Sequence, residues 1–249
     1  VQNLPGGQGA TAVLALLAEP ADGGTLLFAP ASVAGLPFTM KTPPFASMAD
    51  LDVLAAIGGN RMCLFVHPGL GADSLAGFMQ RARGESLRMG QISLGETLIS
   101  TQLMQAGGFR AERVPYTAGP QLLADLVDGR LQAAVLPSGL GAADAEAGRL
   151  HMLACASEQR IAALPQVPTM AEAGLPGLRA PTGHLIVARP GLPAERCAQL
   201  AEAVQRAASR PEVQANLKRL HLDGPAIGPA ASLALVRETE AAWSRFVQD

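Results

Sequence analysis

The sequence predicts an α/β fold. Short apolar runs, each of a length suited to one buried strand, alternate with amphipathic stretches that fit helices. This alternation is typical of a mostly parallel sheet with helices on both faces. The chain has 249 residues, of which 49% are hydrophobic, so it can bury two modest cores. We therefore expect two domains.

Seven apolar runs are the candidate strands. Two amphipathic stretches that lie between these runs are the clearest candidate helices. The strands are expected at residues 25–30, 61–68, 87–93, 112–117, 131–138, 150–157 and 184–190, and the helices at 74–83 and 119–129.

The C-terminal third predicts three helices. Proline is tolerated at the first helical position, so Pro193, Pro211 and Pro229 each mark a helix start. In the first of these helices Leu200, Val204 and Ala207 are expected on one apolar face. In the last, Trp243 and Phe246 are expected to anchor the helix in the core.

Composition excludes several classes of function. The net charge is −2 and no basic stripe is present, so no nucleic-acid partner is expected. No uninterrupted apolar run reaches about eighteen residues, and the chain does not begin with a leader pattern, so the chain as given is expected to be soluble.

The cysteines and histidines show no ligand spacing. Cys63, Cys155 and Cys197 lie far apart, so neither a zinc site nor a disulfide framework can be read from them, and we expect buried, inert thiols. The four histidines are equally scattered, at positions 67, 151, 184 and 221, so no metal site is expected.

Small polar residues follow several of the expected strands. In an open α/β sheet, ligands collect at the carboxyl ends of strands, where backbone N–H groups of the next helix point outward. The residues so placed are Ser32, the stretch Ser93 to Thr97, Thr117, and Ser138. Hydroxyls beside free N–H groups suit carboxylate oxygens, although a Ser or Thr before a helix, taken singly, is most often only an N-cap.

Glu96 falls in one of these strand ends, within "MGQISLGETLIS" (89–100). A helix N-terminus favours an anion, and Glu96 could itself supply that negative charge. Pointed inward, its carboxylate would repel a carboxylate ligand and select a neutral or cationic one. Pointed outward, it would only cap the helix.

Four segments, read in order, resemble one known family. They are "VQNLPGGQGA" (1–10), "PADGGTLLFAP" (20–30), "VPYTAGPQLLADLVDGRLQAAV" (114–135) and "ALPQVPTMAEAGLPG" (163–177). This pattern is similar to the periplasmic solute receptors of tripartite tricarboxylate transporters, also called Bug-type receptors. The resemblance covers essentially the whole chain.

The resemblance implies a two-lobed type II periplasmic binding protein fold that holds a small carboxylate between its lobes. Lobe 1 would comprise residues 1–66 with 186–249, and lobe 2 residues 67–185. It further implies a periplasmic monomer that works with membrane transporter subunits and has neither a cofactor nor catalytic residues.

The sequence departs from the family pattern in three places. The first lobe lacks its N-terminal strand, Gly-rich loop and helix, so we expect an exposed sheet edge and exposed apolar surface there. The loop at 89–96 is altered, with Ile99 at the position of an early histidine. Gly183 and His184 replace an aromatic pair, and Leu136 replaces an acidic residue. The ligand therefore does not follow from the family.

The leading hypothesis is an extracytoplasmic solute-binding protein that closes over a small organic carboxylate and presents it to a transporter. The expected ligand-binding residues are Ser32, Gln91, Ser93, Gly95, Glu96, Thr97, Thr117, Ser138 and His184. The alternative is a sensory or protein-interaction module on the same fold, with altered or lost ligand specificity. An enzyme has the weakest support, because the sequence shows no GxSxG, HExxH or P-loop pattern.

Overall fold

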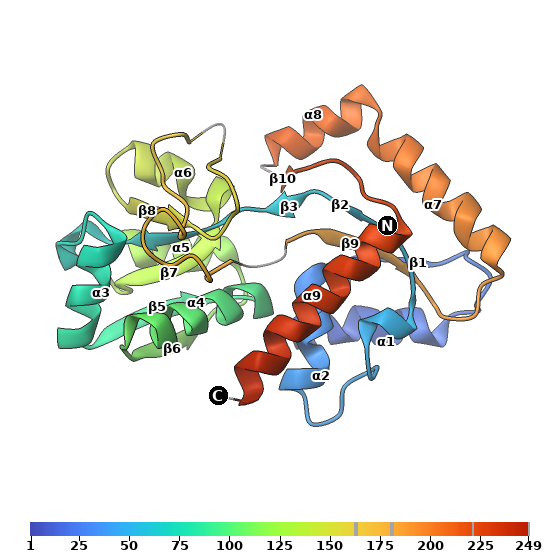
Figure 1. Ribbon diagram of the computed structural model, residues 1–249, viewed down its shortest axis with the longest axis horizontal. Helices are drawn as coiled ribbons and strands as arrows, with labels where there is room; N and C mark the ends of the chain where they lie inside the picture. The colour runs from blue at the N-terminus through green and yellow to red at the C-terminus, as the bar shows by residue number, and fades with distance from the viewer. Residues whose placement is uncertain (162–163, 180–181, 221, 249) are drawn as a thin grey trace. The chain divides into compact units, whose positions relative to one another are not determined.

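The computed structural model describes residues 1–161, 164–179, 182–220 and 222–248 (Figure 1). It divides into two compact units, the first made of residues 1–60 with 181–249 and the second of residues 61–180. Both units combine helices and strands, which confirms the α/β class. His221 lies outside the described residues.

The main sheet of unit 1 has three strands in the order β1-β9-β2. They are β1 (Leu26–Pro30), β9 (His184–Ala188) and β2 (Asp52–Ile57), beside a short ladder of β3 (Gly59–Asn60) and β10 (Leu222–Asp223). β9 runs antiparallel to both neighbours, so the expectation of a mostly parallel sheet is wrong for this unit. Apolar runs report burial and not strand direction, which is why the sequence did not reveal this.

Helices pack around this sheet. They are α1 (Ala10–Ala18), α2 (Leu36–Thr39), α7 (Ala194–Ala208), α8 (Pro211–Arg219) and α9 (Pro229–Gln248), with 3₁₀ turns η1 (Gly7–Gly9), η2 (Ala31–Gly35) and η3 (Met48–Asp50). The three C-terminal helices are thus confirmed. On α7 the fully buried residues are Ala201 and Ala208, whereas Ala207 is exposed, so that helix presents a slightly different face from the expected one.

Trp243 anchors α9, as expected. Its side chain is fully buried, and a Cβ placed on Gly35 of η2 would come within 2.3 Å of Trp243 Nε1. Glycine at position 35 is therefore what allows the indole ring to pack against η2. The side chain of Phe246 lies outside the described part of the chain.

β1 forms one edge of the unit 1 sheet and carries exposed apolar side chains. Leu26 is 39% and Phe28 57% exposed, and Leu14 on α1 is 57% exposed. These side chains give this edge of the sheet an apolar surface.

Unit 2 contains a five-stranded sheet in the order β6-β5-β7-β4-β8. The strands are β4 (Met62–Val66), β5 (Leu87–Gln91), β6 (Ala111–Pro115), β7 (Ala133–Pro137) and β8 (His151–Cys155). β5 runs parallel to β6 and β7, as expected, but β4 runs antiparallel to β7 and β8.

Helices cover both faces of this sheet. They are α3 (Leu75–Gly84), α4 (Leu94–Gly107), α5 (Gly119–Val127) and α6 (Ser138–Glu146), and η4 (Pro68–Leu70) precedes α3. Phe78 of α3 and Ile99 of α4 share one apolar cluster, whereas Leu122 of α5 and Leu140 of α6 belong to the cluster on the other face. A sheet buried on both sides explains why its strands read as nearly continuous apolar runs.

The boundaries of the units differ from the expected lobe boundaries at 66/67 and 185/186. Residues 62–66 belong to unit 2, because β4 pairs with β7 and β8 there. Residues 184–185 belong to unit 1, because β9 pairs with β1 and β2. Strand pairing sets both boundaries. The Pro and Gly residues from which the hinges were predicted carry no information about strand pairing.

A disulfide joins Cys63 to Cys155, so the expectation of inert thiols is wrong for this pair. The two residues lie directly opposite each other on β4 and β8, with their Cα atoms 4.0 Å apart. Their sequence separation of 92 positions concealed the pairing. Cys197 carries a free, half-buried thiol.

Candidate functional site

The candidate site in unit 2 lies where β5 ends and α4 begins. Gln91 is the last residue of β5, and Ser93 is the N-cap of α4. Because β5 lies beside β6 and β7 and runs parallel to both, the carboxyl ends of all three strands meet at one edge of the sheet. This is the position at which α/β sheets bind ligands.

Glu96 bends back over the start of α4. Its Oε2 accepts hydrogen bonds from the backbone N–H groups of Ile92, at 2.6 Å, and Ser93, at 3.1 Å. The residue is only 3% exposed. Of the two orientations that the sequence left open, the structure shows a helix cap, but one that is buried and not turned out to solvent.

Burial also changes the ionisation of Glu96. Desolvation raises the pKa of its carboxyl group from 4.5 to about 7, against the lowering effect of the hydrogen bonds from Ile92 and Ser93. The carboxyl group therefore changes charge near neutral pH, and the negative charge at this helix terminus depends on pH.

A hydrogen-bond network fixes the side chain of Gln91. Its Nε2 donates to Ser100 Oγ at 2.8 Å, and its Oε1 accepts from Thr97 Oγ1 at 3.4 Å. Thr97 Oγ1 also lies 2.9 Å from the Ser93 carbonyl oxygen. Sequence reasoning missed Ser100, although its place one helical turn after Glu96 was a usable signal.

The neighbouring strand-to-helix junctions lie close to this one. A Cβ on Gly119, the first residue of α5, would approach Leu140 of α6 to 2.9 Å and Ile92 to 3.8 Å. Residues that follow β5, β6 and β7 are thus brought together at one place. The missing side chain of Gly119 permits this close approach.

The other expected residues of unit 2 differ in exposure. Thr117 is exposed, whereas Ser138, at the start of α6, is 2% exposed and donates its backbone N–H to the Arg61 carbonyl oxygen at 2.7 Å. Gly95 is half-buried in the first turn of α4.

Ser32 and His184 belong to unit 1. Ser32 is half-buried in η2, and the N–H of the preceding Ala31 donates to the Gly183 carbonyl oxygen at 2.8 Å. The His184 ring stacks on Phe28 with the ring centroids 5.2 Å apart and the planes 12° from parallel. Burial lowers the pKa of His184, although its hydrogen bond to the Gly58 carbonyl oxygen raises it.

The described residues show neither a metal-ligand cluster nor a membrane-spanning helix. Within them, no three His, Cys, Asp or Glu side chains are grouped closely enough to hold a metal ion. No helix in the same residues has the length and apolar character needed to cross a membrane.

The family model described as tripartite tricarboxylate transporter family receptor matches residues 1–249, the whole chain. The chain is 30% identical over 197 residues to a UPF0065 protein of Bordetella bronchiseptica, which covers 77% of this chain and 58% of that protein. It is 29% identical over 198 residues to protein BugT of Bordetella pertussis, which covers 77% of this chain and 60% of that protein. The chain therefore spans less than two thirds of these relatives.

Solved structures share the fold at lower sequence identity. Periplasmic binding protein BugD has a TM-score of 0.85 at 18% identity, with 98% of this chain and 83% of that chain covered. A Rhodopseudomonas palustris protein solved with adipate has a TM-score of 0.85 at 23% identity, with 96% and 82% covered. MatC of the same organism, with bound malate, has a TM-score of 0.82 at 21% identity, with 97% and 85% covered.

Proposed function

Since the chain belongs to the family of tripartite tricarboxylate transporter receptors, we propose that it is a periplasmic solute-binding protein that delivers a small organic carboxylate to a transporter of this type. Receptors of this family bind solutes and are not enzymes. The observation that carries the proposal is the convergence of the β5, β6 and β7 strand ends, with their small polar residues, at one edge of the unit 2 sheet.

The ligand contacts that we propose are side-chain and backbone groups at these strand ends. In unit 2 they come from Gln91, Ser93, Gly95, Glu96, Thr97, Thr117 and Ser138. Ser32 and His184, which belong to unit 1, are proposed separately as ligand contacts. In the first turn of α4 the backbone N–H groups point toward the helix N-terminus, where they favour an anion. The adipate and malate found in two proteins of the same fold support a carboxylate ligand.

The charge of Glu96 sets the pH at which such a ligand binds. An ionised Glu96 would repel a ligand carboxylate and already occupies the N–H groups of Ile92 and Ser93. A protonated Glu96 removes the repulsion and can donate a hydrogen bond. With the pKa of Glu96 at about 7, we expect carboxylate affinity to rise as pH falls from 8 to 6.

The disulfide supports a periplasmic location. Disulfides form and persist in oxidising compartments such as the bacterial periplasm and are rare in the reducing cytoplasm. The Cys63–Cys155 bond lies inside the apolar cluster of unit 2 and is well suited to such a compartment.

Thermal shift and calorimetric titration test the proposal. Malate, adipate and their neutral diamides are titrated at pH 6 and pH 8, because a ligand that binds only the folded state raises the melting temperature. We expect both acids to bind, more tightly at pH 6 than at pH 8. Thr97→Val should weaken the binding of both acids. Ser209→Ala, which removes an exposed hydroxyl from the end of α7, is the matched control. Absence of binding by every carboxylate tested would reject the carboxylate ligand.

A second candidate function is a sensory or protein-interaction module on the same fold. The observation that favours it is Glu96, which takes two N–H groups that a ligand anion would otherwise use. If Glu96→Gln creates carboxylate affinity that the natural protein lacks at every pH, this second function is the better one.

A further inference from the structure

β8 is an open edge of the unit 2 sheet. The strand order gives it one neighbour, β4. On its other side, within the described residues, Thr169 bridges to Cys155 at the end of the strand. An edge strand presents unpaired N–H and C=O groups that can pair with another extended chain.

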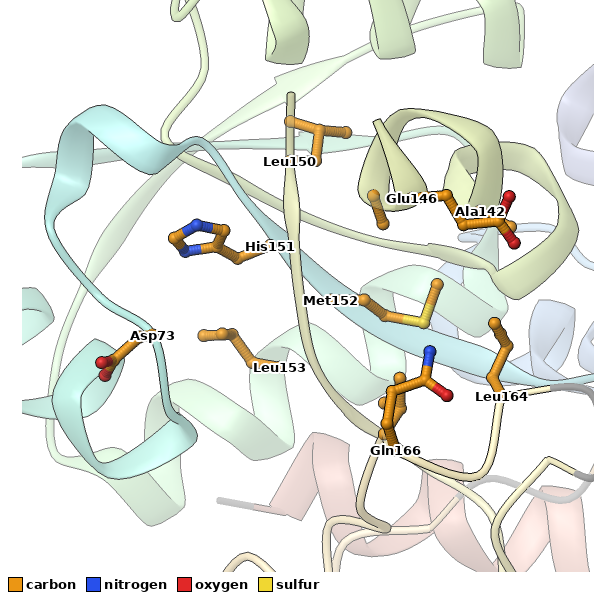
Figure 2. A pocket seen from close by; sticks show the side chains of 11 residues that line it. Asp73, Ala142, Glu146, Leu150, His151, Met152, Leu153, Leu164 and Gln166 are labelled. Carbon is orange, nitrogen blue, oxygen red and sulfur yellow. The ribbon is translucent and has the colours of Figure 1, made fainter. Parts of the chain in front are cut away.

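A hollow of about 290 Å³ follows this edge. Its lining includes four consecutive residues, Leu150 to Leu153. Successive side chains of a strand point to opposite faces, so a hollow that touches four in a row lies over the edge of the strand and not over one face. Figure 2 shows His151 and Leu153 on the side of Asp73, and Met152 on the side of Leu164.

The walls of this groove, which we call the β8 groove, are apolar and acidic. Its other lining residues are Asp73, Ala142, Ala145, Glu146, Leu164, Gln166 and Val167. Asp73 and Glu146 lie on opposite sides of β8 (Figure 2). The lining includes no Lys or Arg, and nearby Arg149 is paired with Asp144, with 2.7 Å between Nε and Oδ1.

The groove is held in shape by its own residues. The His151 ring bonds the Ala72 carbonyl oxygen through Nδ1 at 2.9 Å, which fixes the Asp73 segment beside β8. Because a carbonyl oxygen only accepts, Nδ1 carries the proton. On the opposite side, α6 supplies Ala142 and Ala145, whose small side chains leave room over the strand edge.

We propose that the β8 groove binds an extended, basic segment of a partner protein, which adds a strand to the edge of the sheet. The main chain of the segment would pair with β8, as in other complexes formed by strand addition. Its alternate side chains would reach both sides of the strand, where Asp73 and Glu146 favour positive charge. This proposal goes beyond solute binding and does not depend on it.

The charges also disfavour two other occupants. A small carboxylate would meet Asp73 and Glu146 with the same sign of charge. Two copies of the chain paired through β8 would bring those carboxylates close to their counterparts, and like charges across an interface oppose association.

The test uses a synthetic seven-residue peptide, Val-Lys-Lys-Val-Lys-Lys-Val, whose paired lysines point to both faces of the added strand. Two controls accompany it, one with glutamate in place of lysine and one N-methylated at the backbone positions that face β8. We expect the lysine peptide to bind and to slow hydrogen exchange within residues 151–153. The double variant Asp73→Asn, Glu146→Gln is expected to bind about fivefold more weakly.

Matched variants keep the test decisive. Glu85→Gln with Glu112→Gln removes two exposed carboxylates of unit 2 that lie outside the groove and should leave peptide affinity unchanged. Because Asp73 is exposed in a loop, Asp73→Asn alone supplies a folded variant if the double one unfolds. Equal binding of the glutamate or N-methylated peptide, exchange protection outside β8, or a dimer in sedimentation velocity would each overturn the proposal.

Discussion

Glu96 Oε2 lies 2.6 Å from the backbone nitrogen of Ile92, in the turn that joins β5 to α4. The carboxylate of the chain itself thus occupies part of a helix N-terminus that is otherwise suited to an external anion. Because Glu96 is buried and titrates near neutrality, this contact links the stability of unit 2 to pH.

Glu96→Gln is expected to remove a pH dependence of stability. The raised pKa means that between pH 4.5 and about 7 the folded state binds more protons than the unfolded state, so the free energy of unfolding falls as pH rises through this window. The full effect is on the order of 3 kcal/mol. Glutamine stays neutral, so the variant should be more stable than the natural protein at pH 8.

Urea unfolding at pH 5, 6, 7 and 8 measures this difference. Glu112→Gln, an exposed carboxylate paired with Arg88, is the control and should leave the pH profile unchanged. Parallel profiles for natural protein and Glu96→Gln would show that Glu96 titrates at its ordinary pKa.

Reduction of the disulfide is expected to destabilise unit 2 by about 4 kcal/mol, because the bond closes a loop of 92 residues. Urea unfolding with and without a reducing agent measures the loss, and Cys63→Ala with Cys155→Ala should reproduce it. Cys197→Ala should leave the response to the reducing agent intact. Three reactive thiols in the unfolded, unreduced protein would contradict the Cys63–Cys155 pairing.

Gly35→Ala is expected to destabilise unit 1 by about 1–3 kcal/mol. The new Cβ would lie 2.3 Å from Trp243 Nε1, so the indole ring must move. Trp243 is the single tryptophan of the chain, so its fluorescence spectrum reports that movement directly. Gly84→Ala, at the last residue of α3 where a Cβ meets nothing within 4 Å, is the control and should neither lower the free energy of unfolding nor change the fluorescence.

Phe28→Ala is expected to raise the pKa of His184 toward its ordinary value. Burial lowers this pKa, and the stacked Phe28 ring contributes to that burial. Because the pKa of His184 is lowered in the folded state, the folded state binds this proton less readily than the unfolded state, so the free energy of unfolding falls as pH falls. The Phe28→Ala variant should show a smaller fall. NMR titration of the ring proton measures the pKa. Leu14→Ala, on a side chain equally exposed, should not shift it.

Sequence reasoning located the strands well because burial leaves a local pattern. Each of the seven apolar runs overlaps a strand. β2 (Asp52–Ile57) was missed because its run is rich in small residues with low strand propensity, such as Ala55 and Ala56. Strand direction and the Cys63–Cys155 bond depend on pairing between distant segments, for which a single sequence carries no local signal.

The candidate site, too, was predictable only where it depends on local sequence. The strand-end rule placed Ser93, Glu96 and Thr97 at one junction, and the structure adds Gln91, Ser100 and the Ile92 N–H to the same hydrogen-bond network. The inward fold of Glu96 could not be predicted, because it follows from burial by surrounding elements. Whether these residues contact a ligand stays a prediction.

The position of β9 in the chain affects the order in which the two units can fold during synthesis. β9 is the middle strand of the unit 1 sheet, yet it follows all of unit 2 in the chain. During synthesis, β1 and β2 cannot complete their sheet until β9, which pairs with both, has been made. Residues 61–180 by then already contain all five strands of the unit 2 sheet. Unit 2 is therefore able to mature first, and unit 1 stays open to chaperones until the last quarter of the polypeptide arrives.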